Sequence, residues 1–204
     1  MVLSGVDLAL VIGFRLTTGS GDLDFMIWNL ALAWVPLVAA LALDDVRSTP
    51  LLLQLPLLGL WLVFFPNAPY LVTDIVHIDP SQHSPAGILG GVAIAAAAPA
   101  GLALGFSSLL LVERGLRDRF GAQAALGASV VSLVAASVGI YLGRVVGLNS
   151  WDVLARPRDV AAALHANALD PHPLAAAGTV ALAVVLATLY LRFRSVAAVE
   201  QHAR

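Results

Sequence analysis

Long apolar runs alternate with short polar connections along the whole chain. A helix needs about 20 mainly apolar residues to cross a membrane, and five runs have that length. These runs lie at residues 25–43, 51–76, 86–112, 122–147 and 173–193. A sixth stretch, residues 2–18, is apolar but carries Asp7 and Arg15, so it forms either a short first span or a tilted or interfacial helix. The pattern predicts an all-α, polytopic transmembrane helical bundle with six spans, or five if the first stretch does not cross.

The polar connections are too short to hold a separate soluble domain, so residues 1–204 are expected to form a single integral-membrane helical domain. Charged residues make up 12% of the chain and hydrophobic residues 59%, whereas soluble domains are about one-quarter charged. The net charge of -2 offers no basic surface for nucleic acid. Membrane lipids are the expected partners, and the absence of cysteine excludes disulfides and thiolate metal sites.

The distribution of arginine predicts an orientation. With six spans, seven arginines fall on one side of the membrane and four on the other. The first group is Arg47, Arg114, Arg117, Arg119, Arg192, Arg194 and Arg204, and the second is Arg15, Arg144, Arg156 and Arg158. Cytoplasmic loops carry the excess of positive charge, which predicts a cytoplasmic C-terminus. The polar segments 66–85 and 141–172, together with Trp28-Asn29, then lie on the extracytoplasmic face.

The most unusual segment is Phe65-Pro-Asn-Ala-Pro-Tyr-Leu-Val-Thr-Asp-Ile-Val-His77, at the end of an apolar run. Each proline removes a backbone donor, so carbonyls one turn earlier need other partners where no water is available. A span broken in this way is tolerated where protein or a wet cavity covers it. If a helix resumes after the second proline, Tyr70, Asp74 and His77 share one stripe. Asn67 joins them only if helical geometry survives, and otherwise suits a turn or a cap.

The run 122–147 supplies a cation for this segment. Ser137, Tyr141 and Arg144 share a helical stripe, and Arg144 lies near the predicted depth of Asp74, so an Asp74–Arg144 ion pair is predicted. Gly139, Gly143 and Gly147 form a second stripe that lets a neighbouring helix approach closely. The pair serves either a binding site or the packing of the two spans.

Polar residues after this run predict further short elements. Asn149 or Ser150 caps a short helix, and Pro157 suits the first position of another that runs to about Asn167. The second helix lies either on the membrane surface or as a lid over a pocket. The candidate ligand-binding pocket consists of Asn67, Tyr70, Asp74, His77, Tyr141, Arg144, Asn149 and Asp152.

The two motif regions resemble those of a known family. Phe65-Pro-Asn-Ala-Pro-Tyr-Leu-Val-Thr-Asp74, Gly139-Ile-Tyr-Leu-Gly-Arg144 and Asn149-Ser-Trp-Asp152 are similar to an uncharacterised bacterial multi-pass membrane protein family, a domain of unknown function. The match covers most of the chain, including Trp28-Asn29. The resemblance implies several helices in the bacterial cytoplasmic (inner) membrane, and it implies no reaction, substrate or cofactor.

Three classes of function fit these residues. The first is binding or transport of a small molecule or lipid. The second is a membrane-embedded enzyme acting on a lipid-linked substrate, with Asp74 or His77 as general base, Arg144 holding a phosphate or carboxylate, and Tyr70 or Tyr141 positioning it. The third is a structural or accessory protein in which the polar residues only lock spans together.

Metal and oligomer hypotheses remain open beside these classes. Carboxylate and imidazole ligands for zinc or a harder divalent ion are available. They are Asp74, His77, Asp79 and His83, joined by Asp152, His165 or His172. Glycine pairs at 87/91 and 101/105, or the stripe that begins at Gly139, serve either a homo-oligomer or helix packing within one subunit. The substrate and any cofactor stay unassigned.

Overall fold

The structure, a computed structural model, describes residues 1–79, 81, 83–169 and 172–202, and within them the chain forms helices and no strand. The elements are α1 (Val2–Thr18), α2 (Asp24–Asp45), α3 (Leu51–Phe64), α4 (Asn67–Tyr70), η1 (Leu71–His77), α5 (Pro85–Phe120), α6 (Ala122–Tyr141), η2 (Leu142–Val146), α7 (Asp152–Ala155), α8 (Pro157–Leu169) and α9 (Pro173–His202). η1 is a 3₁₀ helix and η2 is a π-helix. The predicted all-α fold is confirmed.

Among the described residues, five helical stretches are long and apolar enough to cross a membrane. They are Asp24–Asp45, Leu51–His77, Pro85–Phe120, Ala122–Val146 and Pro173–Val199. Each matches a run predicted from the sequence, and the chain is a multi-pass membrane protein. α1 has 17 residues and is not one of the five, so helix length supports the five-span alternative.

The two charged residues of α1 are held by the bundle in different ways. Arg15 donates to the Asp24 carboxylate and ties the end of α1 to the start of α2. Asp7 is 1% exposed, and neither of its carboxylate oxygens has a hydrogen-bond partner in the described part of the chain. α1 packs mainly along α5, so the bundle covers part of this short helix.

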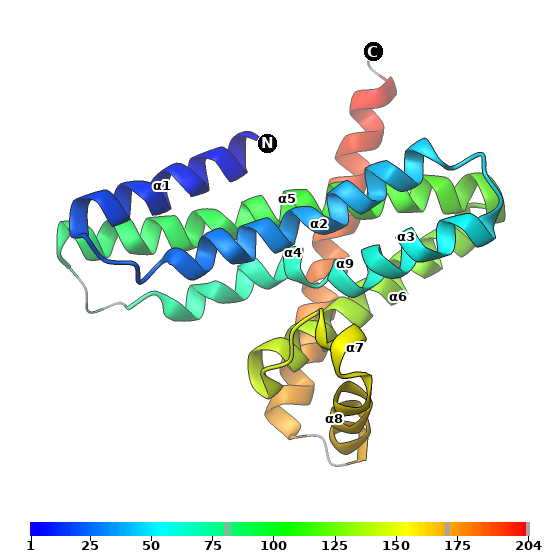
Figure 1. The fold of residues 1–204 in the computed structure, drawn as a ribbon. Coiled ribbons are helices and arrows are strands. Elements are labelled where there is room, and N and C mark those ends of the chain that lie inside the picture. Colours follow the sequence, from blue (N-terminus) through cyan, green and yellow to red (C-terminus); the bar gives the residue numbers. More distant parts are fainter. Residues whose placement is uncertain (80, 82, 170–171, 203–204) are drawn as a thin grey trace.

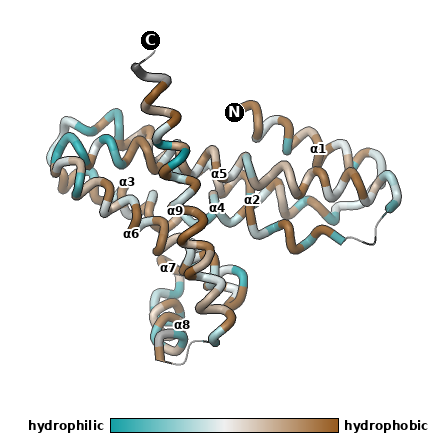
Figure 2. The backbone as a smooth tube through the Cα atoms, turned by 180° about the vertical axis from the view of Figure 1, so that it is seen from behind, coloured by the Kyte–Doolittle hydropathy of each residue, from teal (hydrophilic) through white to brown (hydrophobic). Residues whose placement is uncertain are grey.

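α5 is the helix on which most of the others pack. It extends across the bundle in Figure 1 and contacts α1, α2, α4, η1, α6 and α9. α9 runs across the direction of α2, α3 and α5 in this view, and it packs chiefly against α6. Figure 2 shows that α9 is largely apolar, and its Val180, Val184 and Val185 are exposed. This surface suits contact with lipid.

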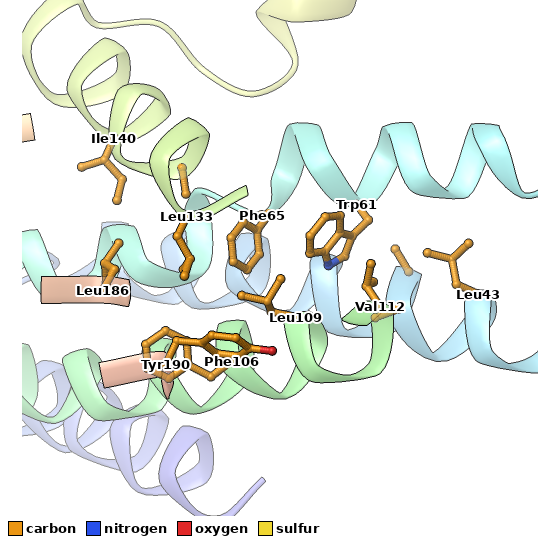
Figure 3. Close-up of a cluster of buried hydrophobic side chains, with 13 residues drawn as sticks. Leu43, Trp61, Phe65, Phe106, Leu109, Val112, Leu133, Ile140, Leu186 and Tyr190 are labelled. Atoms are coloured by element: carbon orange, nitrogen blue, oxygen red, sulfur yellow. The ribbon is translucent and has the colours of Figure 1, made fainter. Parts of the chain in front are cut away.

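Two clusters of buried apolar side chains connect the helices. The larger joins α2, α3, α5, α6 and α9, and Figure 3 shows its aromatic members. The Trp61 and Phe65 rings stack with their centroids 4.9 Å apart, and the Phe106 and Tyr190 rings meet at 5.6 Å. The smaller joins α1, α2, α4, η1 and α5. Because lipid tails are as apolar as these side chains, close packing is the main stabilising term between the helices.

The proline segment bends the chain without ending its helical course. Phe65 and Pro66 keep right-handed helical backbone angles. The Tyr70 N–H donates to the Pro66 carbonyl at 3.0 Å, so one regular helical bond is made between the prolines and the residues after them. The span predicted to be broken is therefore a continuous helical stretch with one irregular turn at Pro66–Pro69.

Asn67 compensates for the irregular backbone hydrogen bonding of this turn. The Ala68 N–H donates to the Phe65 carbonyl at 3.2 Å, one residue closer than in a regular α-helix. The carbonyl of Phe64 is thereby left without its usual backbone donor, and the Asn67 side-chain amide donates to it at 2.9 Å. A buried carbonyl left unpaired in lipid costs several kcal/mol, so the asparagine has a structural role in the span.

Glycines on the neighbouring helices allow those helices to approach the irregular turn closely. A Cβ atom on Gly101 of α5 would lie 2.3 Å from the Ala68 carbonyl oxygen and 2.9 Å from the Leu71 Cβ. A Cβ atom on Gly139 of α6 would lie 2.8 Å from the Pro66 ring. These glycines therefore serve helix packing within one subunit, and a homo-oligomer stays a prediction.

Replacing Gly101 by alanine is expected to lower the free energy of unfolding by about 1–3 kcal/mol, because the added methyl group overlaps the Ala68 backbone. Thermal unfolding in detergent measures the change. Gly115→Ala is the matched control on the same helix, because a Cβ atom there meets nothing within 4 Å. Equal stability of the two variants would contradict the close approach of α4 to α5.

Candidate functional site

A buried ion pair joins η1 to η2 beside the proline segment. Arg144 Nη2 donates to Asp74 Oδ1 at 2.6 Å and to Thr73 Oγ1 at 2.8 Å. The Asp74 side chain is completely buried, and the Arg144 side chain is 25% exposed. Asn29 Nδ2 donates to the other Asp74 oxygen at 3.2 Å, so both carboxylate oxygens are bound. The ion pair predicted from the sequence is present.

The Tyr70 ring packs against the guanidinium group of the same arginine. The Arg144 guanidinium carbon lies 4.3 Å from the centroid of the Tyr70 ring, which is within the range of a cation–π contact. Gly143 of η2 lies close to the same ring, where a Cβ atom would approach it to 3.3 Å. Tyr70 therefore packs against η2 through both Gly143 and Arg144.

The π-helical turn of η2 decides where Arg144 points. Its Leu142–Val146 turn follows α6 directly and departs from the 3.6-residue spacing that placed Ser137, Tyr141 and Arg144 on one stripe. Ser137 donates to the Leu133 carbonyl within its own helix. Tyr141 donates to Asn167 of α8 and lines a separate cavity of about 330 Å³. Ser137 and Tyr141 keep α-helical spacing, whereas Arg144 lies in the π-turn and binds Asp74, so the three side chains meet different partners.

The 3₁₀ winding of η1 changes the stripe predicted for Tyr70, Asp74 and His77. A 3₁₀ helix has three residues per turn, so Asp74 aligns with Leu71 and His77 rather than with Tyr70. Asp74 is buried and His77 is exposed. The His77 ring packs against Phe25 with centroids 5.2 Å apart, and its Nδ1 faces the Asp74 backbone carbonyl. The 3₁₀ spacing therefore keeps His77 in line with Asp74, takes Tyr70 off the predicted stripe, and leaves the His77 ring against Phe25.

A pocket of about 150 Å³ lies where α2, α4, α6 and the loop after η2 meet. Its polar lining residues are Asn29, Asn67, Tyr70, Asn149 and Ser150. The Asn67 amide donates to Ser150 Oγ at 2.7 Å and joins the proline segment to the loop. Val153 of α7 and Val160 of α8 also line the pocket, so these short helices form part of its wall.

Several polar atoms of the pocket lining have no partner in the described part of the chain. They are the Oδ1 atoms of Asn29 and Asn67 and the Tyr70 hydroxyl. No charged side chain belongs to the lining among the described residues. The arrangement can both donate and accept hydrogen bonds, and it presents no net charge.

Asp152 supports the loop that borders the pocket. Its Oδ2 accepts the Asn149 backbone N–H at 2.7 Å, and its Oδ1 accepts from Arg156 Nη2 at 2.9 Å. The Asn149 N–H first, and the Arg156 guanidinium next, hold the pKa of the Asp152 carboxyl below its usual value. Asp152 is not among the lining residues, so its role is to shape the loop that presents Asn149.

The histidine and aspartate residues proposed as metal ligands do not form a cluster in the described part of the chain. His77 packs against Phe25, and His83 Nδ1 lies 2.8 Å from the Ser81 carbonyl. Within the residues that the structure describes, no three histidine, aspartate or glutamate side chains form a group that could hold a metal ion.

Three residues of the pocket and ion pair lay outside the predicted set. Asn29 and Ser150 line the pocket, and Thr73 binds Arg144. Asn29 and Ser150 stand in polar segments of the sequence, so their type and position gave a signal. Thr73 was marked only by its place before Asp74.

Another buried carboxylate, Glu113, falls just after the run 86–112 and is not among the predicted site residues. Its Oε1 accepts a hydrogen bond from Arg117 and forms an ion pair with Arg194, and its Oε2 accepts hydrogen bonds from Ser129 and Tyr190. It thereby joins α5, α6 and α9.

Replacing Arg144 by glutamine leaves the buried Asp74 carboxylate with Asn29 as its remaining side-chain donor, so unfolding in detergent is expected to become easier by about 3 kcal/mol. The double variant Asp74→Asn/Arg144→Gln is expected to recover part of that loss because no unpaired charge remains. Arg158→Gln, an exposed arginine of α8, is the control and is expected to change little. Losses that simply add in the double variant would contradict coupling between the two residues.

Replacing Asp152 by alanine is expected to speed chymotrypsin cleavage at Trp151, because the loop loses its carboxylate acceptor. The lowered pKa means that the stabilising charge is present above the usual aspartate pKa of about 4 and is lost as pH falls through the lowered value. In the wild type, hydrogen exchange of residues 147–156 should therefore stay at its neutral-pH level down to about pH 5, after correction for the intrinsic rate. Asp159→Ala in α8 is the control, and equal cleavage of both variants would refute the role of Asp152.

Comparison with known proteins places these features in a family. Comparisons with curated proteins and with solved structures give no match. The sequence model of DUF1361, described as a protein of unknown function, matches residues 28–191, which include both polar motifs and most of the chain. The chain therefore belongs to the DUF1361 family.

Proposed function

We propose that the protein binds a small molecule, or the polar head of a lipid, in the pocket beside the proline segment. The observation that carries the proposal is the set of polar side chains around one cavity of about 150 Å³ in an otherwise apolar bundle. The polar lining side chains come from α2, α4 and the loop after η2, and the Asn29 and Asn67 amide oxygens and the Tyr70 hydroxyl have no partner among the described residues. Polar groups at this depth are costly to leave without partners, which favours a ligand or ordered water in the pocket.

The lining favours a neutral ligand rich in hydroxyl or amide groups. The Asn29 and Asn67 side-chain oxygens can accept hydrogen bonds, the Tyr70 and Ser150 hydroxyls can donate them, and the Asp74–Arg144 ion pair lies outside the lining. The volume corresponds to about five water molecules at 30 Å³ each. It therefore suits one small molecule or one head-group fragment, with the rest of a larger ligand outside.

We place this pocket near the extracytoplasmic end of the bundle. The orientation rests on the excess of arginine at the opposite end and on the positive-inside rule. Trp28 and Trp151 meet edge to face beside the pocket with centroids 6.3 Å apart, and tryptophans are enriched at the membrane interface. α7 and α8 would then form a lid on the outer side, through which a ligand enters from the membrane surface or from solution.

Binding is preferred to catalysis on geometric grounds. The enzyme hypothesis assigned Asp74 or His77 as base, but neither residue belongs to the lining. Asp74 is held by Arg144 and Asn29, and His77 lies against Phe25. The structural alternative is favoured by one observation, the fully bound carboxylate of Asp74, and it predicts a bundle that folds without any ligand.

The test fills the pocket from the lid without touching its polar groups. Val160→Trp places a large side chain in the wall, and Ala161→Trp, an exposed neighbour on the same helix, is the control. Purified variants are heated with a panel of polyols, hexoses and amides. A ligand at 100 times its Kd stabilises the folded state by about 2.7 kcal/mol. We expect this shift in the wild type and in Ala161→Trp, and its loss in Val160→Trp.

Two outcomes decide between the alternatives. A shift that persists in Val160→Trp would contradict binding in this pocket. A wild-type protein that no compound stabilises, and that yields no co-purified small molecule by mass spectrometry, would favour the structural class. Where a ligand is found, its flux into proteoliposomes separates a transporter from a binding protein.

A further inference from the structure

A second cavity, of about 310 Å³, lies near the C-terminal end of α5, away from the proposed ligand pocket. Arg114 and Arg117 of α5 and Arg194 of α9 line it. Its remaining wall includes the apolar side chains of Leu110 and Leu191. Three guanidinium groups from two membrane-spanning helices thus meet beside an apolar surface.

The local carboxylate neutralises part of this charge. Glu113 binds Arg117 and Arg194 through the same oxygen, while its second oxygen is occupied by Ser129 and Tyr190. Arg114 forms no ion pair within the described part of the chain. Three positive charges against one negative charge leave an excess of two at the cavity.

The donors of this cluster also outnumber its acceptors. Each guanidinium carries five N–H groups, and Glu113 accepts one hydrogen bond from Arg117 and forms an ion pair with Arg194. The Arg117 Nε is buried and has no acceptor among the described residues. A group with several anionic oxygens would satisfy these donors, and the planar fork of arginine matches phosphate in particular.

We infer that Arg114, Arg117 and Arg194 bind a phosphate group, carried either by an anionic phospholipid or by inorganic phosphate. The lipid source is favoured because Leu110 and Leu191 continue the cavity wall along two apolar spans, where acyl chains would lie. Basic pockets between membrane helices on the arginine-rich side bind anionic head groups in this way.

The experiment titrates delipidated full-length protein in detergent with phosphatidylglycerol, with phosphatidylcholine and with inorganic phosphate, using native mass spectrometry and thermal unfolding. Arg114→Gln removes a cavity arginine that has no ion pair to disturb. Arg192→Gln is the matched control, because Arg192 lies on α9 near the same end, is exposed and does not line the cavity. The unfolding temperature without added anion checks that both variants fold like the wild type.

We expect phosphatidylglycerol to bind the wild type more tightly than phosphatidylcholine, and Arg114→Gln to weaken that binding about fivefold. Arg192→Gln should weaken it less than twofold. Saturable binding of inorganic phosphate with the same dependence on Arg114 would support the site and assign it to a soluble anion. Absence of binding by both phosphatidylglycerol and phosphate, or equal weakening by the two variants, would overturn the proposal.

Discussion

Every backbone polar group inside a membrane span needs a partner from the protein itself, and this constraint is sharpest at Pro66 and Pro69. Pro69 has no N–H for the Phe65 carbonyl, so the Ala68 N–H donates to that carbonyl, and the Asn67 side chain takes the place of the Ala68 N–H at the Phe64 carbonyl. The helix can keep this geometry only if other helices cover it closely. Gly101 and Gly139 allow that approach, because any Cβ atom at either position would collide with the segment. The polar pocket lies at this irregular turn, and Pro66, Asn67 and Tyr70 line it.

Two buried carboxylates hold the ends of the bundle in register. Asp74 joins η1 to η2, and Glu113 joins α5, α6 and α9. At 4 Å and an effective dielectric constant of 20, opposite charges attract by about 4 kcal/mol, which is comparable with the cost of removing them from water. Each carboxylate therefore has additional neutral donors, Asn29 for Asp74 and a serine and a tyrosine for Glu113. Such pairs specify the arrangement of helices more than they add to stability.

The separation between charge and pocket has a chemical consequence. Because Arg144 is engaged by Asp74 and stacked on Tyr70, its charge is not presented to the proposed ligand. The pocket is then a site for hydrogen bonding to a neutral group, whereas the unbalanced arginines lie at the far end of α5. The two cavities differ in charge and in position, so one chain can hold two chemically distinct partners.

The sequence alone determined the all-α class, the five long spans and the Asp74–Arg144 pair, because apolar length and charge at matching depth are local properties of each run. It also located the polar segments that line the pocket. Only the tertiary structure decided which polar residues meet. Asp74 lies in the 3₁₀ helix η1 and Arg144 in the π-turn η2, and neither departure from α spacing is written in a periodic pattern. Tyr141 and His77 instead contact Asn167 and Phe25. Glu113 was hidden for a related reason, since its four partners come from three helices that only the fold brings together.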